Sequence, residues 1–441
     1  MGPLPSLVLS AALLATPVLS SSATAPPAGG RIVLVVLDDV GIDRIGAYGE
    51  HPAPGRTPNL DRVAERGLLF RNAYSNPFCS PTRAQLLTGR ASFRTGVGGT
   101  VRQPGLMGFQ IGLDPDEQSL PDALGPSWSS LCIGKWHLAD AEQSTAHPQQ
   151  LGFAHHAGSL YNLGASTSSS GSYYDWWKTI DGVGHHSTRY ATIDTASDAV
   201  RVLQESDPRT FLWLAFNAAH SPAHRPPDEL HAFNLQGDPQ DTPVVHTKAM
   251  IEALDMVLGR VIDVLEPSDY LFVISDNGTD RLATSLPFPP DHGKGTLYEG
   301  GVNVPLLIMG PGVRCGEVKA LVSATDIFAT ICELAGQPST AEDSISLLPY
   351  FEDPDHPSLR RWVYSEHFRP NGPGPYNKWS QAIRGERYKL MRSHDEPDQL
   401  FDLEVDPFEQ VNLLAAEVVD RPASVAYGQL LGWLPVNLSA P

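Results

Sequence analysis

The chain has 441 residues, of which 41% are hydrophobic, so it can bury one large core or two to three smaller ones and is neither disordered nor a coiled coil. Its formal charge of −19 argues against non-specific nucleic-acid binding, and we expect no nucleic-acid partner. The same charge disfavours an anionic substrate unless cations gather locally, and only seven of the 31 basic residues are Lys.

Residues 1–25 have the pattern of a signal peptide, because an apolar stretch at 7–15 is followed by small residues. A disordered N-terminus is the alternative. The stretch is too short to span a bilayer comfortably and no later segment does better, so we expect an exported, periplasmic or secreted protein with no transmembrane span. Four Cys are too few for a disulfide framework, although Cys315 and Cys332 could pair in an oxidising compartment.

The first predicted element is a buried strand at 32–37, where six consecutive apolar, mostly β-branched residues favour a parallel sheet in an α/β domain. A helix follows, with Thr57 as N-cap, Pro58 in the first turn and Gly67 as its end. Further elements are expected in the order strand 131–133, helix 194–205, strand 211–216, helix 248–265, strand 270–274 and strand 304–308. This alternation is typical of a doubly wound sheet.

Polar side chains that can bind ligands or take part in catalysis follow four of these strands. Ligands of open α/β sheets bind outside the carboxyl ends of the strands, so four separate elements indicate one site. The residues, in chain order, are Asp38 and Asp39, Lys135 and His137, Asn217 and His220, and Asp276 and Asn277.

The type of predicted secondary structure changes after about residue 345. Short antiparallel strands are expected at 381–384, 388–391 and 399–403, followed by a helical tail at 411–432. Residues 158–177, rich in Gly, Ser, Tyr and Trp, are predicted to form a long loop. We therefore expect three parts: a signal peptide at 1–25, a catalytic domain at 30–345 and a C-terminal subdomain at 346–441.

A helix is predicted directly after Cys79. Ser80 and Pro81 suit its first turn, an apolar face follows, and Gly89 ends it. Cys79 then lies at the N-terminus of a helix, where backbone N–H groups favour negative charge and a plain thiol would have a lowered pKa. A buried Cys beside a capped helix is the alternative.

The segment 76–90, Asn-Pro-Phe-Cys-Ser-Pro-Thr-Arg-Ala-Gln-Leu-Leu-Thr-Gly-Arg, resembles the activation signature of the type I sulfatases. Its core is Cys-x-Pro-x-Arg, which alone would be a weak signal. Further motifs of that family follow in family order over nearly the whole chain: Asp38-Asp39, Gly134-Lys135-Trp136-His137, Ser275-Asp276-Asn277-Gly278, 293–301, and Tyr388-Lys389-Leu390 to Asn412-Leu413. The resemblance implies an alkaline-phosphatase-like α/β fold, with a large, mostly parallel mixed sheet sandwiched by helices and a smaller C-terminal antiparallel sheet.

A hard metal ion is expected near the strand ends. Carboxylate and amide oxygens suit Ca²⁺ or Mg²⁺, and the lack of clustered Cys or His argues against zinc. An Asp-Asn-Gly sequence can also be a simple turn, although two strand ends together make this less attractive. The resemblance implies Ca²⁺ rather than Mg²⁺, held by Asp38, Asp39, Asp276, Asn277 and the residue derived from Cys79.

The other polar residues have more local arguments. Lys135 and His137 are two residues apart, so their side chains would point the same way in an extended chain. Lys294 lies in a Gly-flanked loop where a ligand can approach closely. Together, Arg83, Lys135 and Lys294 would form a positive spot inside a negative protein, which resolves the conflict with an anionic substrate.

The resemblance also implies a mechanism. A formylglycine-generating enzyme oxidises Cys79 to formylglycine, whose hydrate attacks sulfur and forms a covalent sulfo-enzyme. The metal, Arg83, Lys135 and Lys294 hold oxygens and offset charge. His220, with Lys294, protonates the leaving alcohol, and His137 takes the proton of the remaining hydroxyl so that sulfate departs. Of these residues, the substrate is bound by Lys135, His220 and Lys294.

Two other functions remain open at this point. A phosphonate monoester hydrolase or phosphodiesterase of the same superfamily would use the same aldehyde, and a non-catalytic Ca²⁺-dependent binding protein would usually lack the nucleophile or a ligand, none of which is missing here. The substrate is expected to be a small-molecule or saccharide sulfate ester. Candidates for stacking on a sugar or aryl group, which could equally hold their own loops, are Tyr161, Tyr173, Tyr174, Trp176, Trp177, Tyr376 and Trp379.

Overall fold

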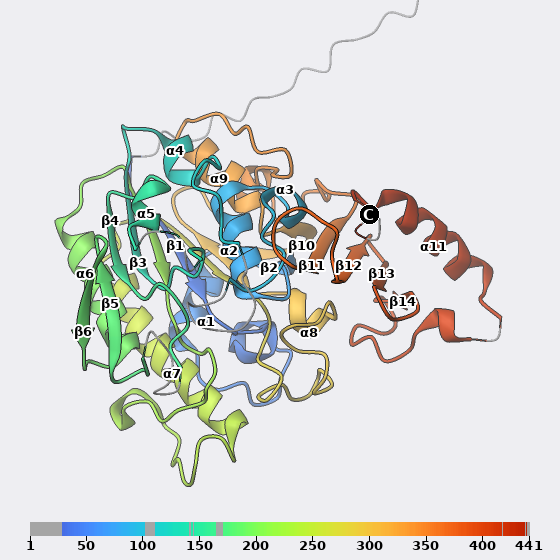
Figure 1. The fold of residues 1–441 in the computed structure, drawn as a ribbon, viewed down its shortest axis with the longest axis horizontal. Coiled ribbons are helices and arrows are strands. Elements are labelled where there is room, and N and C mark those ends of the chain that lie inside the picture. Colours follow the sequence, from blue (N-terminus) through green and yellow to red (C-terminus); the bar gives the residue numbers. More distant parts are fainter. Residues whose placement is uncertain are drawn as a thin grey trace, which may run out of the picture.

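The computed structural model describes residues 29–101, 111–140, 143, 145–164, 171–416, 418–436 and 438 (Figure 1). The predicted signal peptide lies outside these residues. Two sheets, one of ten strands and one of four, form the framework of the described chain. In this part of the chain no helix combines the length and the apolar character that a membrane crossing requires.

The large sheet has the strand order β10-β2-β9-β8-β1-β7-β3-β4-β5-β6. Its centre is parallel, because β1 pairs in parallel with β7 and β8, and β3 pairs in parallel with β7 and β4, whereas β9 and the β4-β5-β6 edge are antiparallel. The predicted mixed, mostly parallel sheet is confirmed. The strands are β1 (Ile32–Leu37), β2 (Leu68–Tyr74), β3 (Ser129–Gly134), β4 (His155–Gly158), β5 (Trp176–Ile180), β6 (Val183–Ser187), β7 (Thr210–Ala215), β8 (Tyr270–Ser275), β9 (Leu306–Met309) and β10 (Gly316–Ser323).

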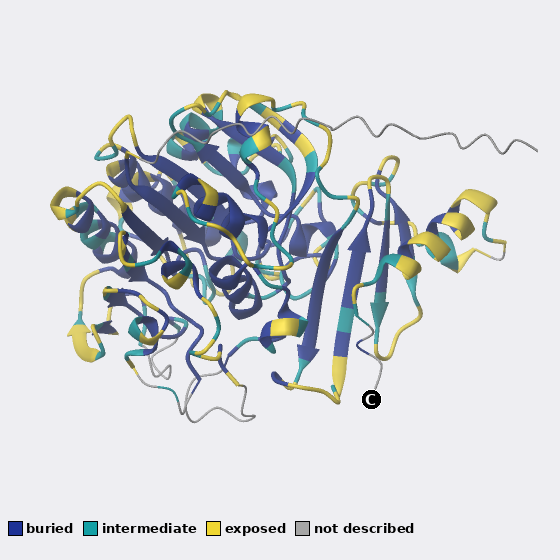
Figure 2. Ribbon diagram, turned by 90° about the horizontal axis from the view of Figure 1, so that it is seen from above, coloured by how far each residue is buried: buried dark blue, intermediate teal, exposed yellow. Residues whose placement is uncertain are grey.

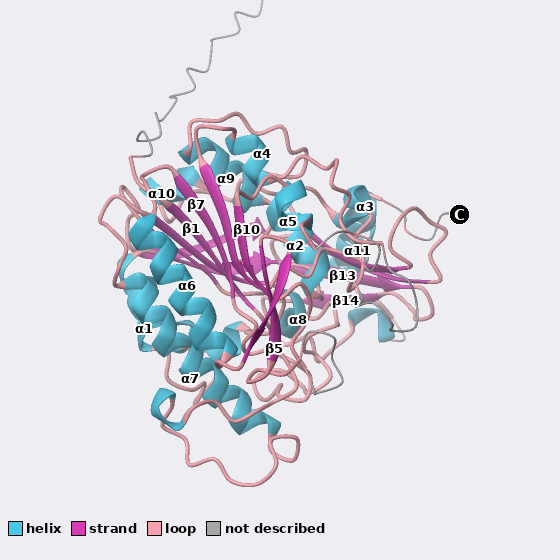
Figure 3. Ribbon diagram, turned by 60° about the vertical axis from the view of Figure 1, so that its left-hand side comes forward, coloured by secondary structure: helices cyan, strands magenta, loops and turns pink. Residues whose placement is uncertain are grey.

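Helices cover both faces of this sheet (Figure 3). One face carries α1 (Pro58–Arg66), α6 (Ala191–Glu205) and α7 (Pro243–Ile262), and the other carries α2 (Cys79–Thr88), α4 (Leu120–Leu124) and α9 (Asp326–Leu334). Alternate residues of β1 enter the two cores, since Val33 and Val35 pack with the first group and Leu34 and Val36 with the second. Each of these fully buried side chains stabilises the fold by about 1.5–3 kcal/mol, which explains the unbroken apolar run of β1.

Gly89 ends α2, as predicted, and adopts the left-handed conformation with φ 67°. The remaining helices are short, apart from the last. They are α3 (Ser92–Thr95), α5 (His147–Gln150), α8 (Glu299–Val302), α10 (Leu348–Glu352) and α11 (Arg421–Trp433), with 3₁₀ turns at Ile42–Arg44, Gly46–Tyr48, Asp228–Leu230 and Leu413–Ala415.

The small sheet is antiparallel and follows chain order: β11 (Val363–Arg369), β12 (Lys378–Arg384), β13 (Tyr388–Ser393) and β14 (Gln399–Asp402). Three of its strands were predicted. The sequence pattern misses β11, because its buried positions include Ser365, Glu366 and His367 and therefore show no apolar alternation.

The predicted helical tail at 411–432 is wrong in its first half. Among the described residues 411–416 and 418–420 the chain forms only the 3₁₀ turn, and α11 begins after Asp420, whose side chain accepts a hydrogen bond from the Ala423 N–H. Pro422 lies in the first turn, where its missing N–H is harmless. An Asp cap followed by Pro is a helix start, which explains why the helix does not extend further back.

The two sheets pack through a shared apolar cluster, in which Tyr74, Leu297 and Val302 contact Val363 and Met391 of the small sheet. Figure 2 shows both sheets largely buried, with exposed residues on the loops and on α11. Short helix α10 packs into the core of the large sheet. The boundary at 345/346 stays a prediction.

One buried carboxyl of the small sheet gives a stability prediction. Burial raises the pKa of Glu366 from 4.5 to about 8, although the Phe93 N–H and the Tyr364 hydroxyl donate to it at 2.8 and 3.2 Å. The folded chain therefore binds a proton that the unfolded chain has lost between pH 4.5 and 8. The stability contributed by this proton is complete below pH 4.5 and is lost as the pH rises to 8, at about 1.4 kcal/mol per pH unit.

The variant Glu366→Gln keeps the shape and one acceptor without the titration. We expect its free energy of unfolding to exceed that of the wild type by an amount that grows from pH 5 to pH 8, reaching about 2–4 kcal/mol. Chemical denaturation at several pH values measures this, with the exposed Glu386→Gln as control. Parallel stability curves for wild type and Glu366→Gln would show that Glu366 does not titrate in this range.

Candidate active site

The carboxyl ends of β1 and β8 bring together four predicted ligand residues. The two strands are parallel neighbours with Leu37 opposite Ser275, so the residues that follow them must meet. Asp38, Asp39, Asp276 and Asn277 are all fully buried. The Asn277 amide donates to Asp39 Oδ1 at 2.7 Å, and Asp276 Oδ1 lies 3.4 Å from the Asp39 backbone N.

Helix α2 adds Cys79 and Arg83 to this cluster. Cys79 is the first residue of the helix, as predicted, and its Sγ lies 3.5 Å from Asp38 Oδ1. Arg83 is one turn later, on the same face of the helix. Its Nε and Nη2 donate to Asp276 Oδ2 at 3.0 and 2.8 Å, and its Nη1 donates to the Lys135 carbonyl at 3.0 Å. The guanidinium is fully buried and fixed against the strand ends.

The predicted thiol activation is wrong for the unmodified polypeptide. Burial and the neighbouring carboxylate of Asp276 raise the pKa of Cys79 well above its usual range, against the weaker effects of Lys135 and Lys294. The helix terminus is only a partial charge, whereas the nearby carboxylates are full charges in a dry environment. A thiol in this setting is a poor nucleophile.

Two lysines balance the aspartates. Lys135 Nζ donates to Asp38 Oδ2 at 2.5 Å, and Lys294 Nζ lies 2.7 and 2.8 Å from the two oxygens of Asp39. Burial would raise the pKa of Asp38, but Lys135, His220 and Arg83 hold it well below the usual range. Burial raises the pKa of Asp39 to about 7, helped by Asp38 and Asp276 and opposed by Lys294. Carboxylate oxygens gathered at one buried point are ligands that a divalent ion prefers, and here the two lysines offset their charge.

The two predicted histidines are neutral bases, His137 buried and His220 partly buried. Burial lowers the pKa of His137 and of His220 well below the usual value. His137 Nε2 donates to the Val101 carbonyl at 3.0 Å, which leaves its buried Nδ1 without a hydrogen-bond partner and able to accept a proton. His220 Nδ1 faces the Ser221 carbonyl at 2.5 Å, and its Nε2 is 4.0 Å from Asp39 Oδ2. The extended chain expected around His137 is wrong, because its φ is 63°.

The cluster fits a hard divalent cation. The ligand atoms of Asp38, Asp39, Cys79 and His220 lie within 4.8 Å of one another. Within the described part of the chain, Asn277 Oδ1 is buried without a hydrogen-bond partner, and an unsatisfied amide oxygen on a residue that contacts Asp39 is a ready metal ligand.

The aromatic residues of the predicted loop are mostly structural. Tyr161 and Tyr173 are buried; the Tyr173 hydroxyl donates to the Asn217 and His220 carbonyls, at 2.9 Å for the latter, and so supports the backbone of His220. Sequence reasoning missed this supporting role. Trp176 and Trp177 belong to β5, so the loop ends earlier than predicted; residues 165–170 lie outside the described chain.

The two aromatic candidates of the small sheet are also packed. Tyr376 contacts the Phe368 ring at 4.4 Å between centroids, and Trp379 is buried. The four cysteines are all free, with Cys315 exposed and Cys332 buried, so the suggested disulfide is not present.

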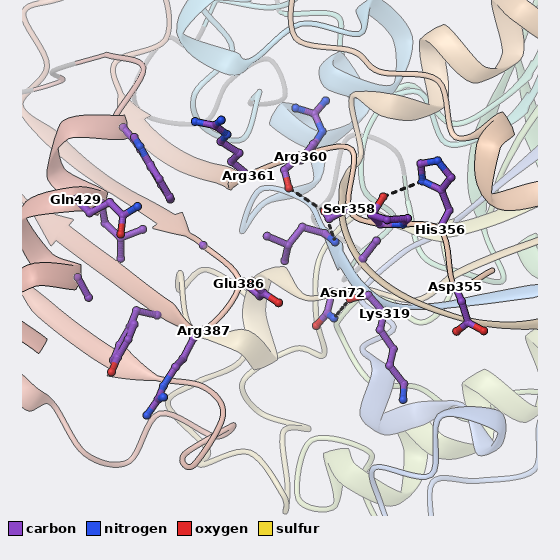
Figure 4. A pocket seen from close by; sticks show the side chains of 18 of the residues that line it. Asn72, Lys319, Asp355, His356, Ser358, Arg360, Arg361, Glu386, Arg387 and Gln429 are labelled. Atoms are coloured by element: carbon purple, nitrogen blue, oxygen red, sulfur yellow. Dashed lines mark hydrogen bonds between the residues drawn. The ribbon is translucent and has the colours of Figure 1, made fainter. Parts of the chain in front are cut away.

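A cavity of about 730 Å³ lies between β10, the small sheet and α11 (Figure 4). It contains none of the predicted site residues, and its Arg360 and Arg387 pair with Asp326 and Asp402. Two other cavities, of about 480 and 610 Å³, share four lining residues, and Lys294 lines the second. The shared residues are Phe78, Arg281, Asp291 and Gly295. These two cavities therefore lead to the cluster around Cys79.

Comparison with known proteins agrees with this geometry. The Sulfatase family model matches residues 31–337, about two thirds of the chain. The chain belongs to the sulfatase family. A second family model, described as N-sulphoglucosamine sulphohydrolase, C-terminal, matches residues 291–424.

Individual sulfatases give the same result. The chain is 33% identical over 380 residues to N-acetylgalactosamine-6-sulfatase of Sus scrofa, covering 78% of this chain and 68% of that one. Arylsulfatase A of Homo sapiens is 28% identical over 460 residues, covering 93% and 88%. Among solved structures, Ps i-CgsB superposes with a TM-score of 0.74 at 26% identity, covering 92% and 93%. The predicted family, fold and sulfuric ester hydrolase activity of this sulfatase are confirmed.

Proposed function

We propose that this sulfatase hydrolyses the sulfate ester of a saccharide to an alcohol and inorganic sulfate, with residue 79 acting as formylglycine. The observation that supports this most is the position of Cys79, which starts α2 within 3.5 Å of Asp38 while Arg83 is fixed to Asp276 one turn later. A saccharide is favoured because N-acetylgalactosamine-6-sulfatases are among the relatives at 30% identity or more.

Asp38, Asp39, Asp276, Asn277 and residue 79 would hold Ca²⁺ in this proposal, with Mg²⁺ as the lesser alternative. A bound cation supplies positive charge that polarises the sulfate oxygens and favours the ionised form of the nucleophile. Asn277 contributes an oxygen that has no hydrogen-bond partner among the described residues.

The side chains around this cation have separate roles. Arg83 is held rigidly by Asp276 and places positive charge beside residue 79. Lys135 and Lys294 hold sulfate oxygens, and His220 with Lys294 delivers the proton to the leaving oxygen; both groups already meet at Asp39 Oδ2. His137, neutral and with a free Nδ1, takes the proton of the second hydroxyl of residue 79.

Maturation and export complete the proposal. A formylglycine-generating enzyme is the expected partner during synthesis, because the segment around Cys79 resembles the activation signature and the raised pKa makes the unmodified thiol a poor nucleophile. The apolar stretch at 7–15 supports export to the periplasm or the medium.

Turnover of matched esters tests the activity. We expect the mature protein to hydrolyse 4-nitrophenyl sulfate and sulfated monosaccharides, with kcat/KM at least about tenfold above that for the corresponding aryl phosphonate ester. Sulfate release and nitrophenolate absorbance measure the two classes. A higher kcat/KM for the phosphonate ester would favour the phosphonate hydrolase instead, and no turnover of any ester would leave only the binding-protein alternative.

A further inference from the structure

One face of the small sheet forms a wall of the 480 Å³ cavity beside the reaction centre. Side chains alternate along a strand, so His367 and Arg369 of β11 share a face with Ser380 and Lys378 of β12, which lie directly opposite them. All four line the cavity. The opposite wall includes Phe78 and Gly295, the neighbours in sequence of Cys79 and Lys294.

Two positive charges are placed opposite each other in this wall. Arg369 and Lys378 are cross-strand partners, and their Cβ atoms lie about 4.5–5.5 Å apart in such a pair. Like charges in this position destabilise a sheet. Lys378 is exposed and forms no ion pair within the described part of the chain. An anion bound beside Lys378 would offset its charge and lower this repulsion.

The neighbouring side chains hold Arg369 toward the reaction centre. Its Nε lies 3.2 Å from His367 Nε2, and its guanidinium lies 5.8 Å from the centre of the Phe78 ring. His367 in turn packs against Phe78 with ring centroids 4.7 Å apart. Burial, Arg369 and Lys378 lower the pKa of His367 to about 3, so the imidazole accepts the Arg369 N–H. The arginine is thus fixed before any ligand binds.

The cavity is lined by three cations, Arg281, Arg369 and Lys378, and by three carboxylates, Asp291, Asp395 and Glu396. Of its carboxylates, Asp395 pairs with His394 at 2.6 Å and Asp291 lies 4.0 Å from His292, while Glu396 also lines the cavity. Arg281 adds a further cation and lines both this cavity and the one reached by Lys294. Arg369 and Lys378 lie side by side on β11 and β12, whereas the three carboxylates lie outside these two strands.

We propose that Arg369 and Lys378 bind a second anionic group, a sulfate or a carboxylate, on the same saccharide whose sulfate ester is cleaved. This inference rests on the proposed function. A planar guanidinium and an ammonium together suit a tetrahedral or planar oxyanion. The two residues set specificity rather than take part in the chemistry, and the substrate class is a saccharide with at least two anionic groups.

Turnover by Lys378→Ala on paired substrates tests this. The substrates are 4-nitrophenyl sulfate, a 6-sulfated amino sugar with no other charge, its disulfated counterpart, and a sulfated disaccharide with a uronic carboxylate. We expect kcat/KM for the last two to fall by about tenfold to a hundredfold, mainly through KM, with less than about twofold change for the first two. The control is Lys319→Ala, an exposed lysine that lines the distant cavity. Lys378→Arg should restore most of the loss.

The substrate that loses turnover identifies the anion: a loss confined to the disulfated sugar assigns a sulfate, and one confined to the uronic disaccharide assigns a carboxylate. An equal change on all four substrates, or no change on any, overturns the inference. Calorimetric binding of the same saccharides to Cys79→Ala, with and without Lys378→Ala, measures the subsite without turnover. A wild-type protein that cleaves no sulfate ester would contradict the proposed function, whereas unchanged binding on loss of Lys378 would contradict this inference.

Discussion

Replacement of Cys79 by alanine is expected to lower kcat for sulfate ester hydrolysis by at least about 10⁴-fold while the protein still folds. The large loss follows because residue 79 supplies the attacking atom, and no other nucleophilic side chain of the described cluster lies in its place beside Asp38. Alanine suits the first turn of α2, and removing one buried sulfur costs only about 1 kcal/mol. Initial rates with 4-nitrophenyl sulfate and thermal unfolding measure the two properties.

The matched control is Cys332→Ala, since Cys332 is equally buried but packs in α9, away from the site. We expect it to retain full turnover. Cys79→Ser gives a second comparison: a single hydroxyl can accept the sulfo group but lacks the second hydroxyl that releases it, so turnover should also be lost. Retained multiple turnover in Cys79→Ala would rule out the nucleophile assignment.

Asp39→Asn is expected to lower the affinity for Ca²⁺ and to reduce turnover by at least about a hundredfold at trace calcium, with partial recovery in excess calcium. Asp39 touches Asn277 and Lys294, and it is one of three buried carboxyl groups at this point. Asn tolerates the φ of 61° found here, so the change removes charge without straining the backbone. Metal content after gel filtration and rates over a calcium series measure both effects.

Asp61→Asn is the control for this variant. Asp61 lies on α1 and accepts a hydrogen bond from the Ala47 N–H at 2.8 Å, so it is a partly buried carboxylate outside the cluster. Its metal content should equal that of the wild type. If Asp39→Asn also kept its full metal content and its rate, Asp39 would not be a ligand.

Much of the fold could be predicted because the clearest apolar runs in the sequence are the buried strands themselves. The apolar run at 32–37 is β1 itself, and the residues after β1 and β8 meet because parallel neighbours end at the same edge. The C-terminal motif from Tyr388-Lys389-Leu390 to Asn412-Leu413 could also be recognised in the sequence. The contacts of Lys389 in this motif were not visible: it binds Glu299 and Glu409 at 2.9 Å each and ties the small sheet to the start of α8.

What the sequence could not show depends on contacts between distant segments. Asp39 and His137 adopt positive φ angles that no residue pattern predicts. Strand β11 is hidden because it buries Glu366 and His367, and its position opposite β12 is what brings Arg369 and Lys378 together. The pKa of Cys79 likewise follows from Asp276, 197 positions later in the chain, rather than from its own helix.

The mass of the tryptic peptide 72–83 tests the central claim most directly. Cleavage after Arg71 and Arg83 releases Cys79 in one fragment. In active protein produced with a formylglycine-generating enzyme, we predict a peptide that has lost one sulfur and two hydrogens and gained one oxygen, together with its hydrate. Detection of only the intact thiol in protein that turns over sulfate esters would contradict the claim.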